Sequence, residues 1–168
     1  RPAPGSGDGW GLGFARFKNR MSYVGVVFHL SVDRDKGDIE LIHATAVCDA
    51  GLIINPDGVS AQIEGGIIQS ASWTLKEQLR FNESQIQSRD WASYPILRFD
   101  EVPEVQVHLI LNNNQPALGV GEAAQGPTAA AIANAVFHQS GRRLRQLPLS
   151  PRQFLKSPPH RPPARVGR

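Results

Sequence analysis

Apolar residues dominate two neighbouring segments of the chain that are separated by a polar turn. The first, residues 23–32 (YVGVVFHLSV), is β-branched and aromatic, and the second covers residues 39–47. Such composition is typical of β-strands. Residues 33–38 between them include Gly37, which is available for the positive φ of a tight turn. The pattern predicts an antiparallel hairpin.

A different periodicity follows the hairpin. Asn55, Pro56 and Asp57 form a helix start, because Asn caps, Pro suits the first helical position and Asp favours the positive helix end. The helix is expected to run to about Leu79. One apolar face recurs at three- and four-residue spacing, at Val59, Ile63, Ile67, Ser70 and Thr74.

Gly65 and Gly66 interrupt this helix, and each costs about 1 kcal/mol relative to Ala. Two such costs in one turn indicate that something packs very closely there. That neighbour is either another backbone or a ligand, and the sequence leaves both open.

The remaining segments complete a mixed pattern. We expect short strands and loops over residues 80–100, a strand over 104–111, and an alanine-rich helix from about Ala123 or Pro127 to Gln139. Gly141 follows as its C-terminal glycine, and Ser150 is placed to cap a last short helix through Lys156. The predicted fold class is α+β, with antiparallel strands and two principal helices. Residues 1–12 are expected to be a loop or fragment end, and 13–156 the domain.

The positive charge gathers at one end of the chain. The net charge is +3, but residues 142–168 carry eight of the 18 Lys and Arg and none of the 15 Asp and Glu, so the other 141 residues sum to 10 − 15 = −5. A basic tail can bind nucleic acid. The prolines of residues 157–168 favour instead a solvated, disordered tail without a nucleic-acid partner.

Several classes of site are excluded by composition. One cysteine, Cys48, allows no internal disulfide and no cysteine-based zinc or iron–sulfur centre within this chain. We expect it to be a small core residue. The histidines lack metal-binding spacing, so no metal ligand is predicted. No apolar run approaches the roughly 20 residues of a membrane span.

Glu122 has the best-defined chemistry when residues are considered alone. Gly119 and Gly121 precede it, so the backbone can approach a ligand closely before a helix start. The helix dipole favours a negative charge there, as a general base requires. The alternative, favoured on spacing alone, is that Glu122 only stabilises the helix start. Gln62 likewise has an amide suited to a heterocycle edge, or it is a buried amide that satisfies backbone groups.

Three segments in this order resemble one known family. Residues 49–66 (DAGLIINPDGVSAQIEGG), 88–105 (SRDWASYPILRFDEVPEV) and 119–135 (GVGEAAQGPTAAAIANA) together resemble the xanthine dehydrogenase and aldehyde oxidase family of molybdenum hydroxylases. The likeness is strongest to the bacterial isoquinoline 1-oxidoreductase and nicotinate dehydrogenase type. It covers about residues 10–156 and corresponds to the C-terminal part of the molybdopterin-binding subunit.

The resemblance implies a function and a set of site residues. The cofactor would be a molybdenum–pterin, commonly a cytosine dinucleotide form in bacteria, and the substrate an aldehyde or N-heterocycle that gains oxygen from water. Glu122 matches the family's Gly-x-Gly-Glu base, and Gln62 matches a glutamine beside the pterin. Gly119, Gly121 and Asn55 are assigned to cofactor binding on the same basis.

The resemblance also implies what this chain lacks. The upstream part that supplies other cofactor loops is absent, and iron–sulfur clusters belong to other domains or subunits in the family. We therefore expect as partners the remainder of the molybdenum-binding subunit and an iron–sulfur subunit or other electron-transfer partner. The isolated chain is expected to be inactive and to retain no molybdenum. The competing hypothesis is a non-catalytic interaction module that keeps the fold.

Overall fold

The computed structural model describes residues 7–159. Their strands form one four-stranded sheet in the order β1-β2-β3-β4. The bounds are β1 Gly9–Arg16, β2 Tyr23–Val32, β3 Ile39–Asp49 and β4 Glu104–Ile110. The helices are α1 Pro56–Leu75, α2 Gln125–Ser140 and α3 Pro151–Lys156, and the short 3-10 turns are η1 Phe17–Asn19 and η2 Phe99–Glu101.

The predicted hairpin is confirmed. Strands β2 and β3 pair antiparallel, with Val26 opposite Ala46. Gly37 lies in the turn between them at φ 80°. A register shift between His29 and Leu30 marks a bulge near the turn end of the hairpin.

The sheet is mixed, so the expectation of antiparallel strands holds for only part of it. Strand β4 pairs parallel to β3, with Ala46 opposite Val107. Parallel neighbours need a crossover connection, and α1 together with residues 76–103 provides it. The α+β class is confirmed.

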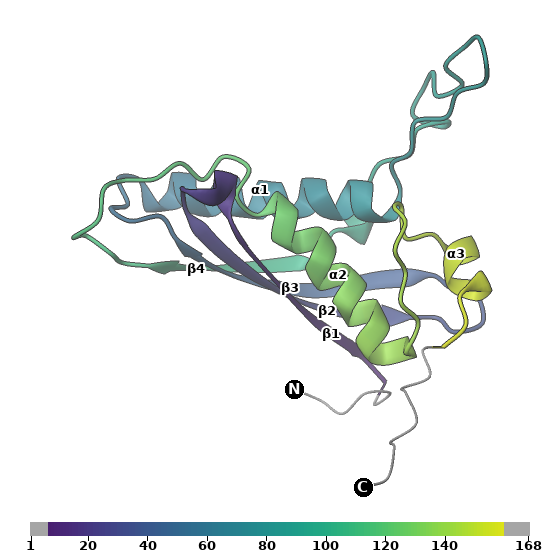
Figure 1. Cartoon of the computed structure of the whole chain (residues 1–168), viewed down its shortest axis with the longest axis horizontal. Helices are drawn as coiled ribbons and strands as arrows, with labels where there is room; N and C mark the ends of the chain where they lie inside the picture. The colour runs from purple at the N-terminus through teal and green to yellow at the C-terminus, as the bar shows by residue number, and fades with distance from the viewer. Residues whose placement is uncertain (1–6, 160–168) are drawn as a thin grey trace, which may run out of the picture.

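Helices α1 and α2 lie on the same face of the sheet and enclose the core (Figure 1). Alternate residues of β2 point into this core, and the apolar faces of both helices cover them. Its largest fully buried side chains include Phe28, Leu30, Ile63, Ile67, Ile132 and Val136.

The predicted helix boundaries need small corrections. The first helix ends at Leu75 with Lys76 as C-cap, not near Leu79, because the chain turns into the segment that leads to β4. The second begins at Gln125 and ends at Ser140, and Gly141 takes the left-handed conformation expected after it. The short helix capped by Ser150 is confirmed as α3.

The expectation of a loop over residues 1–12 is wrong from Gly9 onward. Residues 9–16 form strand β1, which pairs with β2 at the sheet edge. Gly9, Gly11 and Gly13 alternate along it and face α2. A Cβ atom on Gly11 would lie 2.1 Å from the carbonyl oxygen of Ala131, so the helix lies directly on the strand backbone. The glycines are therefore packing residues of a strand, not signs of a loop.

Residues 1–6 and 160–168 fall outside the described residues, and so does most of the predicted basic tail at 157–168.

Candidate active site

The structure brings together three short segments of the motifs, residues 49–56, 62–66 and 119–125. The first, at the end of β3, holds the loop that leads to Gly119. The Leu118 N–H donates to the Ala50 carbonyl at 2.9 Å, and the Leu52 N–H donates to Gln115 at 3.1 Å. Gly51 has φ 66°, and a Cβ there would lie 2.1 Å from the Pro116 carbonyl oxygen. Only glycine combines this backbone conformation with so close an approach.

The second segment, on α1, packs against the turn that leads into α2. A Cβ atom on Gly66 would lie 3.4 Å from the Cβ of Ala124. The Gln125 amide donates to the Gln69 side chain at 2.7 Å. An added Cβ on Gly66 would thus make only ordinary van der Waals contact, and Gly65 faces open space with no heavy atom within 4 Å of an added Cβ. Within residues 7–159, the very close backbone neighbour that the two glycines left open is not found.

Glu122 lies in the turn of residues 121–124, three residues before α2 begins. Its side chain is exposed, and it forms no hydrogen bond or ion pair within residues 7–159. The α2 N-cap is Ala124, which has no side-chain cap bond. A cap role for Glu122 therefore has no hydrogen bond to support it, and the carboxylate is available to a ligand.

The other predicted site residues lie on the same loop as Glu122 and on α1. Gln62 is exposed on α1, one turn before Gly66. Gly121 faces open space, whereas an added Cβ on Gly119 would meet the Met21 methyl at 2.8 Å. The Asn55 side chain accepts from the Gly58 N–H at 3.0 Å and so caps α1. Within residues 7–159, neither Asn55 nor Gln62 forms a hydrogen bond with Glu122.

Two serines at this site had no role assigned from the sequence. Ser22 donates to the Gly119 carbonyl at 2.9 Å, and Ser70 donates to the Gln125 carbonyl at 2.8 Å. Both are fully buried. Ser70 was placed correctly on the apolar face of the helix. Buried polar side chains are usually hydrogen-bonded. A serine on an apolar helix face was therefore the one signal in the sequence that the Ser70 hydroxyl has a hydrogen-bond partner.

The chain between α1 and β4 forms a projecting arm, residues 76–98, which extends beyond the end of α1 (Figure 1). It contains one isolated bridge, Phe81 to Ile86, and η2 follows it, close to the short strands and loops expected over residues 80–100. Most of its large apolar side chains are exposed, with Trp91 at 75%, whereas Leu97 packs against the core.

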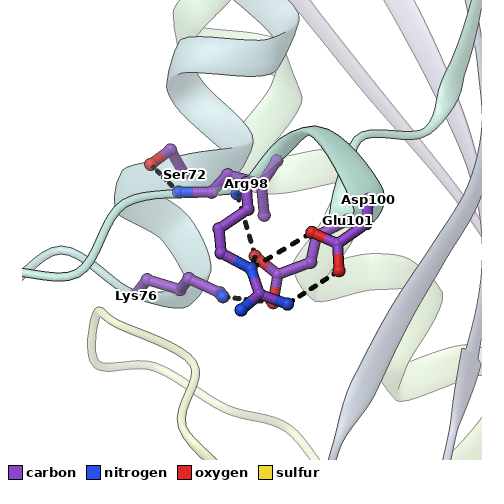
Figure 2. Close-up of polar contacts among 6 residues, drawn as sticks. Ser72, Lys76, Arg98, Asp100 and Glu101 are labelled. Carbon is purple, nitrogen blue, oxygen red and sulfur yellow. Dashed lines mark hydrogen bonds and ion pairs between the residues drawn. The ribbon is translucent and has the colours of Figure 1, made fainter.

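Polar contacts hold the base of the arm against α1 (Figure 2). The Leu97 N–H donates to the Ser72 hydroxyl at 2.9 Å, and Lys76 pairs with Glu101. Arg98 binds Asp100 through two nitrogens, at 2.7 and 3.1 Å. Burial would raise the pKa of Glu101, but the hydrogen bonds from Lys76 and from the Arg98 backbone outweigh it and lower the pKa from its ordinary value.

Cys48 is a core residue, as expected. It is completely buried in β3. Burial, with a smaller contribution from the charge of Asp49, raises the pKa of its thiol to about 11. A thiol with such a pKa is almost entirely protonated near neutral pH, so it is a poor nucleophile.

Two other kinds of feature are absent from the described part of the chain. Among residues 7–159, no cluster of three or more His, Cys, Asp or Glu is arranged to bind a metal ion. None of the helices in that range is both long and apolar enough to cross a membrane.

Comparison with known proteins defines the class to which this fold and site belong. A molybdopterin cofactor-binding domain model matches residues 11–103. The chain is 40% identical to the B subunit of nicotinate dehydrogenase from Pseudomonas putida over 148 residues, or 84% of this chain. It is 32% identical to the beta subunit of isoquinoline 1-oxidoreductase from Brevundimonas diminuta over 90% of its length. The chain belongs to the molybdopterin cofactor-binding domain family of the molybdenum hydroxylases.

Solved structures have the same fold. Quinoline 2-oxidoreductase from Pseudomonas putida 86 superposes with a TM-score of 0.73 over 82% of this chain, at 24% identity. The aldehyde oxidoreductase of Desulfovibrio desulfuricans gives 0.71 over 81% of this chain, also at 24% identity. The aligned regions cover 19% of the quinoline 2-oxidoreductase chain and 15% of the aldehyde oxidoreductase chain. The chain likewise spans 12% and 19% of the length of the two curated relatives.

Proposed function

We propose that this chain provides the active-site base and part of the cofactor pocket of a molybdenum hydroxylase that oxidises an aldehyde or an N-heterocycle. The overall reaction is R–H + H₂O → R–OH + 2H⁺ + 2e⁻. The observation that carries the proposal is Glu122 itself. Its carboxylate is exposed and unpaired within the described residues, on a turn whose main chain is anchored to β3 and α1.

Two exposed stretches of main chain and one side-chain amide support the cofactor-binding part of the proposal. Gly121 and Gly65 both face open space, so no side chain covers the backbone at either position. Gln62, exposed on the same helix as Gly65, offers an amide that both donates and accepts hydrogen bonds. These residues would hold one side of a molybdenum–pterin. The cytosine dinucleotide form, which the resemblance to bacterial family members implies, is part of the proposal.

The bound cofactor supplies the two-electron acceptor and brings the water-derived oxygen to the substrate. Glu122 takes the proton released as that oxygen bonds to the electron-poor carbon. A base does this when it is ionised and within hydrogen-bond reach of the proton. Gln62 orients the pterin edge, and Gly121, which faces open space, lets the main chain come close to the ligand. Gly119, whose missing Cβ makes room for Met21, would contribute only main-chain groups. Electrons then leave to an iron–sulfur subunit or another electron-transfer partner.

The isolated chain is expected to retain no molybdenum and to oxidise no substrate, since it corresponds to under a fifth of its curated relatives. Elemental analysis and dye-linked oxidation of an aldehyde by the purified chain check this. Stoichiometric molybdenum with turnover would contradict it.

Steady-state turnover of the complete oxidoreductase tests the base. Glu122→Gln is expected to lower kcat by about 100-fold or more, within the usual range for loss of a general base, with molybdenum content unchanged. Glu64→Gln, an exposed glutamate on α1, is the matched control and keeps full activity. Full turnover by Glu122→Gln would instead favour the interaction module that retains only the fold.

A further inference from the structure

The turn that carries Glu122 is short, and Gly121 within it and Gly119 just before it leave its own backbone weakly restrained. Glycine lacks a Cβ and has more accessible backbone conformations than any other residue. The exposed Glu122 side chain has no partner within residues 7–159 that could hold it. A catalytic group needs its position held to about 0.5 Å. The restraint must therefore come from contacts of the main chain on either side.

Two buried hydroxyls supply such contacts at equal distances along the chain. Ser22, just before β2, donates to the carbonyl of Gly119, three residues before Glu122. Ser70, on α1, donates to the carbonyl of Gln125, three residues after it. Both serines are 0% exposed. The two bonds connect the turn to the sheet on one side and to the long helix on the other.

Apolar contacts also anchor the main chain between the Gly119 and Gln125 carbonyls. Ala123 and Ala124, the residues directly after Glu122, are 3% and 1% exposed. Ala124 packs on Gly66, so its side chain is held against α1. The main chain is therefore anchored on both sides of Glu122 while its carboxylate remains in solvent.

The residue type at position 70 is not explained by α1 alone. Serine is a poorer helix former than alanine, and its hydroxyl often bonds to the carbonyl of the preceding turn. Here the Ser70 hydroxyl donates across to the Gln125 carbonyl at the start of α2. The Ser70 side of this bond is fully buried, and low-dielectric surroundings strengthen a hydrogen bond.

We propose that Ser22 and Ser70 are positioning residues that hold the Glu122 turn in its working geometry. This inference rests on the proposed role of Glu122 as the base. It concerns only residues of this chain, and the order of the turn can be measured independently of activity.

Ser72 provides a matched control for the Ser22 and Ser70 hydrogen bonds. Ser72 is also buried on α1, but its hydroxyl accepts from the Leu97 N–H and so holds the arm. Ser72→Ala removes one hydroxyl bond from the same helix without touching residues 119–125. Any effect specific to the turn must therefore appear in Ser22→Ala and Ser70→Ala and be absent from Ser72→Ala.

The experiment uses the complete, cofactor-loaded oxidoreductase and measures amide hydrogen exchange by peptide. Ser22→Ala and Ser70→Ala are each expected to speed exchange in residues 119–125 about fivefold, as loss of one net hydrogen bond predicts, with other peptides unchanged. Ser72→Ala speeds exchange near Leu97 only. A uniform increase over the whole chain, or none at residues 119–125, overturns the proposal. If Ser22→Ala does not fold, Ser22→Cys, a weaker donor of similar size, takes its place.

Kinetics of the same variants complete the test. A displaced base lowers kcat while KM for the substrate stays within about twofold, because substrate binding does not depend on proton transfer. Unchanged kcat despite faster exchange of the turn overturns the positioning role. If Glu122→Gln itself keeps full turnover, the proposed base is wrong. If Glu122→Gln is inactive and both serine variants are fully active, Glu122 remains the base and only the positioning role of Ser22 and Ser70 is wrong.

Discussion

Gly66 on α1 and Ala124 before α2 face each other where the helix meets the turn that carries Glu122. A Cβ atom on Gly66 would lie 3.4 Å from the Cβ of Ala124, an ordinary van der Waals contact. Two motifs separated by more than 50 residues in the sequence are joined at this point. Ala124 lies two residues after Glu122, so this contact helps to fix the distance between the Glu122 turn and α1. The packing of the helices therefore also affects the candidate active site.

The glycines of β1 should be far less tolerant of substitution than those facing solvent. A Cβ on Gly11 would lie 2.1 Å from the Ala131 carbonyl oxygen and 2.2 Å from the Ala135 nitrogen. Gly11→Ala is therefore expected to lower the free energy of unfolding by about 2–3 kcal/mol, the usual range for overpacking. Urea unfolding of the chain measures this change.

Gly65→Ala is the matched control for Gly11→Ala. Gly65 faces open space in mid-helix, and alanine there should raise the free energy of unfolding by about 1 kcal/mol. Equal effects of the two substitutions would contradict the packing of α2 on β1.

Local signals in the sequence predicted the central elements well. The β2–β3 hairpin, the Asn55 cap and the Gly141 helix end each depend on residues close together in the chain, so their chemistry is visible there. Strand β1 was missed because Gly9, Gly11 and Gly13 are typical of loops. These positions need glycine because α2, more than 110 residues away in the sequence, packs directly on the strand backbone. No local sequence pattern reveals that contact.

The candidate site was predicted in part for the same reason. Residue type and motif order indicated Glu122 and Gln62, and the structure leaves both exposed. The parallel pairing of β4 and the hydroxyl bonds of Ser22 and Ser70 depend on contacts between distant segments. Sequence patterns could not predict these partners.

Asn55 has a structural duty that can be separated from cofactor binding. Its side chain accepts from the Gly58 N–H, so Asn55→Ala should lower the free energy of unfolding by about 1 kcal/mol. Asn55→Ser should lower it much less, because serine also caps helices well. If Asn55 also contacts the cofactor, Asn55→Ser lowers the molybdenum content of the complete enzyme. Unchanged molybdenum content in Asn55→Ser would leave Asn55 as a cap only.

The base of the arm should loosen in acid. The pKa of Glu101 is lowered from the ordinary glutamate value in the folded chain, so its contacts with Lys76 and Arg98 contribute fully above that ordinary value. They are lost as pH falls through the lower folded-state pKa, because protonation removes the charge. Hydrogen exchange near Leu97, corrected for the intrinsic exchange rate at each pH, should therefore accelerate in acid, below the ordinary pKa of glutamate, in the native chain.

Glu101→Gln should abolish most of this pH dependence, since glutamine does not titrate in that range. Glu83→Gln is the control, because Glu83 is exposed and forms no ion pair in the described part of the chain. Identical acid responses in the native chain and Glu101→Gln would contradict the role of this carboxylate.

The most direct test of the central claim is a single-turnover measurement on the complete, cofactor-loaded enzyme. The rate at which substrate reduces the cofactor without oxygen isolates the chemical step from later electron transfer. If Glu122 is the base, Glu122→Gln slows this step by about 100-fold or more, while Glu64→Gln matches the native rate. A native reduction rate in Glu122→Gln, with full molybdenum content, would show that the proton is taken by another group.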